Sequence, residues 1–178
     1  MSTGLVENIP YWLKNYDLTL FAPVKYRPVS YARNFCAKTF LESDHDVLWF
    51  VDSDTIPTKA SLEMLLRADK MAISGVVRAP KLDSDGITKA VGMVLRATPE
   101  GYKEAVGVGI ERIDASGCAC MLLRREVFER IEFPWFAEKS WGPSRGEDIS
   151  FCEKMCDAGI ELWAHFDVNC RTLKEVEL

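Results

Sequence analysis

The sequence predicts an α/β fold, a single domain over residues 1–178 with a mixed, mostly parallel sheet flanked by helices. Two observations lead to this prediction. Short apolar runs without polar alternation, Val47–Val51 above all, indicate strands that are covered on both faces. Helical patterns separate these runs, an order typical of parallel sheets. With 48% hydrophobic and 28% charged residues, the 178-residue chain has the length and composition of one globular domain.

The first half of the chain alternates helix and strand. Residues 29–42 form the first predicted helix, because apolar side chains recur every four residues on one face. The strand Val47–Val51 follows a polar break. Pro57 opens a second helix with a stripe of leucines. Residues 71–77 form a second apolar strand, in which Gly75 allows close approach of backbone or ligand.

Strands dominate the middle of the chain, and a helix and a strand end the pattern. The remaining elements, in chain order, are strands at 91–96 and 103–110 that pair as a hairpin, a strand at 118–123, helices at 125–131 and 147–158, and a strand at 161–166. The polar segment 83–86 is a predicted turn. A long loop, rich in aromatic residues, proline and glycine, covers 132–146.

Charge and hydropathy exclude several classes of function. Lys and Arg number 22 against 27 Asp and Glu, and the resulting net charge of −5 disfavours binding to a nucleic-acid polymer. No run approaches the roughly 18 apolar residues of a membrane span, and residues 1–10 lack a signal-peptide pattern. We therefore expect a cytoplasmic protein whose six cysteines are reduced thiols.

Two carboxylates stand directly after the strand Val47–Val51. Asp52 and Asp54 lie at the edge of the sheet where ligands bind in open α/β folds. The two side chains can converge there on Mg²⁺ or Mn²⁺, cations that take oxygen ligands and bridge to phosphates. An acidic turn that caps the following helix is the alternative interpretation.

A second acidic pair, Glu147 and Asp148, opens the helix over 147–158. Helix N-termini favour negative charge, which by itself explains the pair. A carboxylate in this position can also act as a general base toward a hydroxyl group. Arg33, near the start of the first helix, can pair with a phosphate or with Asp52, or face solvent.

The loop before that helix carries Phe133, Trp135, Phe136 and Trp141. Aromatic faces suit the apolar faces of sugar rings, so the loop is a candidate wall or lid. In that interpretation, Trp135 and Trp141 contact an acceptor. Packing in the core is the alternative for each ring.

Four segments follow one another in a recognisable order, over roughly residues 29–159. They are Ser30–Asn34 (SYARN), Leu48–Asp54 (LWFVDSD), Gly117–Phe128 (GCACMLLRREVF) and Gly146–Cys152 (GEDISFC). As an ordered set they resemble the nucleotide-sugar glycosyltransferases of the GT-A fold, in particular the inverting, family-2-like enzymes.

The resemblance implies a role for each matched residue. The implied donor-binding residues are Arg33, Asn34, Asp52 and Gly117, to which Gly75 is added as a point of close approach. The implied metal ligands are Asp52 and Asp54. The implied catalytic residues are Asp148, as the base toward the acceptor hydroxyl, and Glu147, beside it. Reaction by single displacement would invert the configuration at the anomeric carbon.

The chain departs from the family pattern at both ends. Relatives often carry a histidine after the last strand, where this chain has Thr172. Metal affinity would then be weaker, or Arg171 or Lys174 would neutralise phosphate instead. Residues 1–6 look like the sequence that follows the family's first strand, so that strand is expected to be absent. Leu18–Val24 looks like the second strand.

The resulting expectation is a metal-dependent, inverting, hexosyltransferase-like enzyme that uses Mn²⁺ or Mg²⁺. Its partners would be a nucleotide sugar and a hydroxyl-bearing acceptor. A sheet edge left exposed by the missing strand leaves oligomer formation open. Two alternatives remain: a truncated, inactive relative that binds nucleotide sugar or acts as a structural subunit, and a nucleotidyltransferase, which would typically carry a glycine-rich basic loop near its start.

Overall fold

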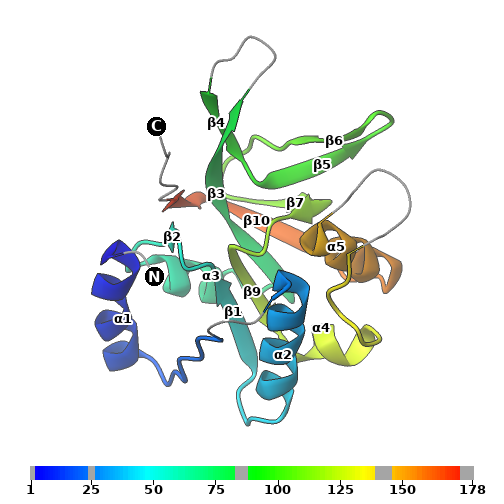
Figure 1. Ribbon diagram of the computed structural model, residues 1–178. Helices are drawn as coiled ribbons and strands as arrows, with labels where there is room; N and C mark the ends of the chain where they lie inside the picture. The colour runs from blue at the N-terminus through cyan, green and yellow to red at the C-terminus, as the bar shows by residue number, and fades with distance from the viewer. Residues whose placement is uncertain (1–2, 24–26, 83–87, 139–145, 173–178) are drawn as a thin grey trace.

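The computed structural model describes residues 3–23, 27–82, 88–138 and 146–172, and these segments form five helices and ten strands (Figure 1). The helices are α1 (Thr3–Asn15), α2 (Val29–Leu41), α3 (Ser61–Arg67), α4 (Arg125–Arg130) and α5 (Glu147–Asp157). The strands are β1 (Val47–Val51), β2 (Thr55–Ile56), β3 (Ala72–Leu82), β4 (Thr88–Gly92), β5 (Val94–Thr98), β6 (Gly101–Glu104), β7 (Ile110–Ile113), β8 (Ala115–Ser116), β9 (Cys120–Arg124) and β10 (Leu162–Thr172).

A mixed sheet forms the centre of the molecule. Its strand order is β1-β9-β3-β10-β2, with β4 paired to β3 and β7 paired to β10. Strands β6, β5 and β8 form a smaller antiparallel sheet. The α/β fold is confirmed, but strand direction differs from the prediction. Among the described strands, only β3 and β10 pair in parallel, so the sheet is mostly antiparallel.

The position of β9 explains this difference. An unbroken apolar run indicates burial on both faces of a sheet, but it does not indicate direction. After the β-rich segment 88–116, the chain returns as β9 between β1 and β3 and runs against both of them. Val51 lies opposite Cys120, and Ala72 lies opposite Leu123.

The strands β1, β3 and β10 nevertheless share one direction. Both β1 and β3 oppose β9, and β10 is parallel to β3. Their carboxyl ends therefore point to the same edge of the sheet, at which β9 begins. The N–H of Asp52 donates to the carbonyl of Ala119 at 3.1 Å, which fixes the end of β1 beside the turn before β9. The candidate site lies along this edge.

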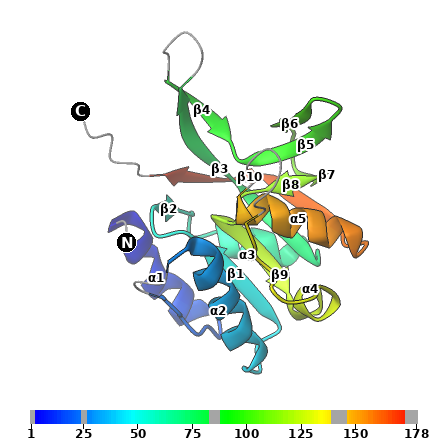
Figure 2. The ribbon, with the colours of Figure 1, turned by 45° about the vertical axis from the view of Figure 1, so that its right-hand side comes forward.

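Helices cover both faces of the central sheet (Figure 2). One hydrophobic cluster joins the sheet to α2, α4 and α5, and a second cluster joins it to α1 and α3. The alternation of a strand is visible on β9, where Met121 and Leu123 belong to the first cluster and Cys120 and Leu122 to the second. None of the helices among the described residues has the length and apolar character needed to cross a membrane.

The N-terminal segment differs from the expectation that the resemblance raised. Residues 3–15 form α1, whose Leu5 and Trp12, two turns apart, are buried against the sheet. Residues 17–23 form no strand, so the predicted strand at Leu18–Val24 is not found in its described part. Phe21 in this segment contacts the ring of Phe35 on α2 instead, with ring centroids 5.6 Å apart.

Several further boundaries differ. The helix predicted to open at Pro57 begins at Ser61 as α3, and the predicted strand over 91–96 is divided between β4 and β5. Strands β3 and β10 are longer than predicted, and β10 continues past an irregularity in its pairing between His165 and Asn169. The predicted strand over 103–110 is interrupted between the end of β6 at Glu104 and the start of β7 at Ile110, and within this gap Gly109 has a φ of 61°, which lies outside the β region. The predicted turn at 83–86 lies outside the described residues.

Candidate active site

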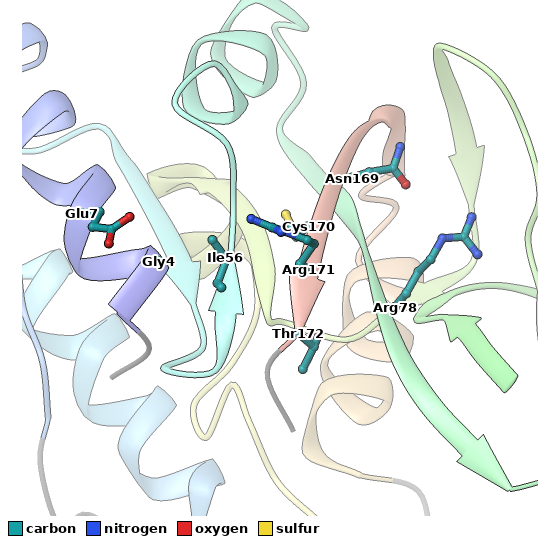
Figure 3. A pocket seen from close by; sticks show the side chains of 8 residues that line it. All are labelled: Gly4, Glu7, Ile56, Arg78, Asn169, Cys170, Arg171 and Thr172. Atoms are coloured by element: carbon teal, nitrogen blue, oxygen red, sulfur yellow. The ribbon is translucent and has the colours of Figure 1, made fainter. Parts of the chain in front are cut away.

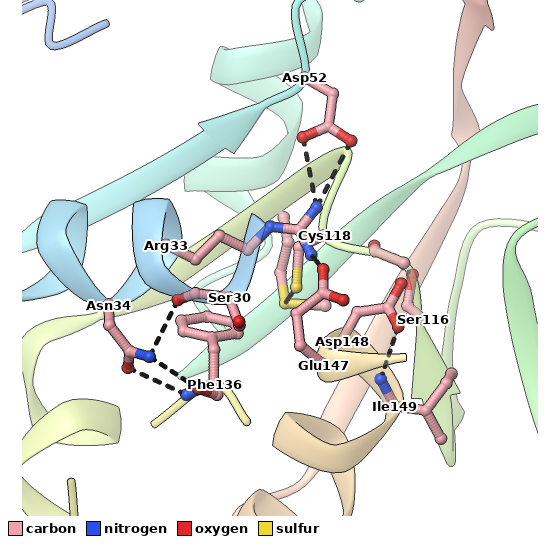
Figure 4. A network of polar contacts seen from close by, with 12 residues as sticks. Ser30, Arg33, Asn34, Asp52, Ser116, Cys118, Phe136, Glu147, Asp148 and Ile149 are labelled. Atoms are coloured by element: carbon pink, nitrogen blue, oxygen red, sulfur yellow. Dashed lines mark hydrogen bonds and ion pairs between the residues drawn. The ribbon is translucent and has the colours of Figure 1, made fainter. Parts of the chain in front are cut away.

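Arg33 is the centre of a polar network that joins three of the four matched segments (Figure 4). Its side chain projects from α2 and is only 9% exposed. Nη1 donates to Oε1 of Glu147 at 2.5 Å, and Nη2 donates to Oδ1 and Oδ2 of Asp52 at 3.3 and 3.4 Å. One guanidinium group thus joins the end of β1 to the start of α5.

The charges of this network compensate one another. Burial by itself disfavours the charged guanidinium, but the surrounding negative charge outweighs burial, and the pKa of Arg33 is raised above its ordinary value. The thiol of Cys118 also lies close, and its burial raises its pKa well above the usual range, so it stays neutral. The charged partners of Arg33 are therefore Asp52, Glu147 and Asp148.

Asp148 lies in the first turn of α5, half-buried beside the turn that carries Gly117. Its Oδ1 accepts the N–H of Ile149 at 2.8 Å, and a Cβ built on Gly117 would lie 3.5 Å from its Oδ2. Burial raises the pKa of Asp148, and the charge of Glu147 adds to that, while the Ile149 N–H and Arg33 partly offset it. Raised proton affinity in a carboxyl group is a property expected of a general base.

Asp52 and Asp54 lie on the same edge of the sheet. The Asp52 side chain is 43% exposed, and Asp54 is half-buried. The next residue, Thr55, is fully buried, and its hydroxyl has no hydrogen-bond partner. Thr172, opposite Thr55 in the β2–β10 pair, carries a second buried hydroxyl without a partner.

These oxygen donors suit a hard divalent cation. No cluster of three or more His, Cys, Asp or Glu side chains able to hold a metal occurs within residues 3–23, 27–82, 88–138 and 146–172. Mg²⁺ in phosphate-transferring sites is commonly held by one or two carboxylates together with water and substrate phosphate. Asp52 and Asp54 fit a cation that completes its coordination in this way.

A pocket of ≈ 590 Å³ opens beside β2, between the start of α1 and the end of β10 (Figure 3). Its lining residues are Gly4, Glu7, Ile56, Arg78, Asn169, Cys170, Arg171 and Thr172. Two of them, Arg78 and Arg171, are basic and one, Glu7, is acidic, and Nη1 of Arg78 also pairs with Oε1 of Glu104 at 3.6 Å. Thr172, the residue in place of the expected histidine, lies in this pocket. Lys174 lies outside the described residues.

Two residues assigned to the donor site have structural partners instead. The Asn34 amide donates to the carbonyls of Ser30 and Phe136, at 2.9 and 2.6 Å, and accepts the N–H of Phe136 at 3.1 Å. It thereby holds the loop after α4 against α2. A Cβ on Gly75 would lie 2.7 Å from Cγ1 of Val168, so this glycine makes room for β10 rather than for a ligand.

The aromatic loop is divided between core and surface. Trp135 and Phe136 are buried, and Nε1 of Trp135 donates to the carbonyls of Phe128 and Ile131, at 2.9 and 3.0 Å. Trp135 is therefore not placed to contact an acceptor, and core packing accounts for it. Phe133 is 67% exposed. Trp141 lies outside the described residues.

The positions of two residues in the site were not predicted from the sequence. Cys118 lies against Arg33, and Met93, between β4 and β5, lies next to Gly117. The N–H of Gly117 donates to the carbonyl of Met93 at 2.9 Å, and a Cβ on Gly117 would lie 3.5 Å from Cβ of Met93. A single apolar residue between two strands carries no pattern that would connect it to Asp148. The return of the chain through β8 brings the two together.

Comparison with known proteins supports the fold. No protein-family model and no curated protein sequence matches the chain. Among solved structures, A197 from STIV superposes with a TM-score of 0.67 at 18% identity, over 97% of this chain and 79% of that one. GalNAc-T7, solved with UDP, GalNAc and Mn²⁺, superposes with a TM-score of 0.58 at 15% identity, over 99% of this chain and 36% of that one.

These similarities identify a GT-A-like mixed α/β fold. At such low sequence identity, the similarities support the fold and nothing more. This chain spans about a third of the length of GalNAc-T7. The UDP, GalNAc and Mn²⁺ belong to the GalNAc-T7 structure. A fold of this kind does not by itself determine activity, which depends on the residues of the site.

Proposed function

We propose that this protein is a metal-dependent, inverting glycosyltransferase that moves a sugar from a nucleotide-sugar donor to an acceptor hydroxyl. One observation carries the proposal. Asp148, a carboxyl group whose pKa is raised mainly by burial, lies at the sheet edge that also bears Asp52 and Asp54, and Arg33 links the two sides. A base and a pair of oxygen donors on one edge are what single-displacement transfer requires.

Asp148 is the base in this reaction. The acceptor oxygen attacks the anomeric carbon, its proton passes to the Asp148 carboxylate, and the bond from that carbon to the phosphate oxygen breaks. The nucleoside diphosphate leaves with the electron pair. The transition state has oxocarbenium character, as in glycoside hydrolysis, and attack opposite to the leaving group inverts the configuration. Glu147, held by Arg33, keeps the first turn of α5 in place.

Asp52 and Asp54 would hold the divalent cation, Mn²⁺ or Mg²⁺, which stabilises negative charge on the departing diphosphate. The pocket with Arg78 and Arg171 lies beyond β2, which directly follows Asp54, and it offers further positive charge to phosphate oxygens. Gly117, beside Asp148, leaves space for the reacting groups next to the base. The whole chain acts as one domain in this proposal.

Ligand-dependent thermal stability and product formation test the proposal. Mn²⁺ together with one member of a panel of nucleotide sugars should raise the melting temperature, and donor hydrolysis or transfer should be detectable. Asp54→Ala should abolish the metal-dependent part of the shift, whereas Asp44→Ala, at an exposed position outside the site, should preserve it. The proposal fails if no nucleotide sugar in the panel stabilises the protein. Stabilisation without turnover would identify a nucleotide-sugar-binding protein instead.

A further inference from the structure

Arg33 has partners that a ligand-binding arginine would not be expected to have. The resemblance to glycosyltransferases assigns it to the nucleotide or its phosphates. In the structure its guanidinium is buried and turned toward two carboxylates of the protein itself, one on each side of the site. A residue placed in this way holds other side chains rather than a substrate.

The two ion pairs of Arg33 are unequal. The pair with Glu147 is short, 2.5 Å, and the Glu147 side chain is 15% exposed. The pair with Asp52 is longer, 3.3 Å, and the Asp52 side chain is 43% exposed. Solvent screens an exposed pair, so it contributes little, whereas removing one partner of a buried pair leaves an uncompensated charge in the interior. The bond to Glu147 is therefore the permanent one, and the bond to Asp52 is the one that can exchange.

We propose that Arg33 is a positioning residue with one fixed and one exchangeable partner. It holds Glu147 at the start of α5 at all times. It occupies Asp52 only until a divalent cation, bound with a nucleoside diphosphate, takes over that carboxylate. The cation in this step rests on the proposed function, whereas the holding of Glu147 does not.

Electrostatics favours this exchange. A doubly charged cation that coordinates the exposed Asp52 directly replaces a singly charged guanidinium at hydrogen-bond distance. Arg33 loses little by releasing Asp52, because Glu147 stays within 2.5 Å and Asp148 also acts on its charge. Arg33 thus competes with the cation for Asp52. An arginine that bound the nucleotide would instead assist the cation and its diphosphate.

This competition gives a test with opposite signs for the two roles. Mn²⁺ binding, in the presence of UDP, GDP or CDP, is followed by the electron paramagnetic resonance signal of free Mn²⁺. Glu147→Gln serves as the reference, because Arg33→Met alone would leave the Glu147 carboxylate buried and unpaired. Adding Arg33→Met to Glu147→Gln should tighten Mn²⁺ binding about threefold or more, the range of one moderate ion-pair coupling. Unchanged or weaker binding would overturn the competition.

A matched control separates local competition from a change in net charge. Lys38→Met, also in the Glu147→Gln background, removes one positive charge from an exposed position on the same helix. It should leave Mn²⁺ affinity within about twofold, because solvent and salt screen exposed charges. A gain as large as that of Arg33→Met would show a general effect of charge and would contradict the proposed exchange.

The fixed partner is tested without any ligand. Double-mutant cycles on urea unfolding combine Arg33→Met with Glu147→Gln, and separately Arg33→Met with Asp52→Asn. The unfolding equilibrium constant should show a coupling of about tenfold or more for the first pair and about threefold or less for the second. Equal couplings would refute the positioning role. Should neither the wild type nor any variant bind Mn²⁺ with a nucleoside diphosphate, the proposed function and the exchange both fail, while this cycle still decides the role of Arg33 toward Glu147.

Discussion

Alanine at Gly75 and alanine at Gly117 distinguish a glycine that serves packing from one that serves the site. At Gly75 the added Cβ would lie 2.7 Å from Cγ1 and 3.1 Å from the carbonyl oxygen of Val168, and 3.1 Å from Sγ of Cys120. Part of this obstacle is the backbone of β10, at the irregularity between His165 and Asn169, and backbone moves aside less readily than a flexible side chain. Overpacking of this kind costs about 1–3 kcal/mol.

Gly117→Ala meets no such obstacle. The added Cβ would lie 3.5 Å from Oδ2 of Asp148 and 3.5 Å from Cβ of Met93, which is ordinary van der Waals contact, and Gly117 does not have a positive φ. We expect the free energy of unfolding to stay within about 1 kcal/mol of the wild type. The methyl group occupies space directly beside the proposed base. Sugar transfer should therefore fall about tenfold or more through misplacement of the reacting groups.

Urea unfolding followed by circular dichroism measures the stability of both variants, and product formation with the best donor measures transfer. We expect the Gly75→Ala protein to be destabilised, and the Gly117→Ala protein to keep its stability but lose transfer activity. Gly75→Ala with wild-type stability would refute the packing argument. Gly117→Ala with both wild-type stability and wild-type transfer would refute the placement of substrate beside Asp148.

Three further substitutions have expected outcomes. Asp148→Asn should raise the free energy of unfolding at neutral pH, because the raised pKa of Asp148 means that its ionised form is disfavoured in the folded state. Urea titrations at several pH values measure this gain in stability. The gain should shrink to a constant remainder as the pH falls below about 3.9, the ordinary pKa of Asp. A gain that grows toward low pH would contradict this sign. Asn34→Ala should lower the free energy of unfolding by about 1–3 kcal/mol in the same assay, since it leaves backbone groups of Phe136 unpaired. Nucleotide-sugar binding should stay intact. Loss of binding without loss of stability would return Asn34 to the donor site. Trp135→Phe should lower the free energy of unfolding by about 1 kcal/mol, because the hydrogen bonds of Nε1 are lost. An altered acceptor preference in transfer assays would contradict a purely structural role for Trp135.

Local patterns in the sequence were reliable where burial alone determines structure. The helices α2 and α5 and the strand β1 lie within a residue or two of their predicted bounds, because each has an apolar stripe or run that must be covered. The acidic residues Asp52, Glu147 and Asp148 were selected as candidates for a related reason. They stand at the ends of such elements, where polar side chains can reach a ligand.

The partners of individual side chains could not be predicted in this way. Asn34 and Trp135 are chemically suited to a sugar-binding site, yet both bond to backbone groups of the protein. Asn34 bonds to Phe136, about a hundred positions away, and Trp135 bonds to carbonyls at the end of α4. Gly75 looked like a point of ligand approach because β10, the strand that pairs beside it in the sheet, is remote in sequence. The spacing of residues along the sequence does not indicate which distant segments pack against each other.

The amino-acid sequence by itself determined the alternation of helices and strands, the two covered faces of the sheet, and the acidic residues at its edge. Only the tertiary structure decided the direction of β9, the folding of residues 3–15 as α1, and the two unequal partners of Arg33. The physical reason is that burial is encoded locally, in the spacing of apolar residues. Strand direction and ion pairing arise from contacts between segments far apart in the chain, and such contacts exist only once the chain has folded.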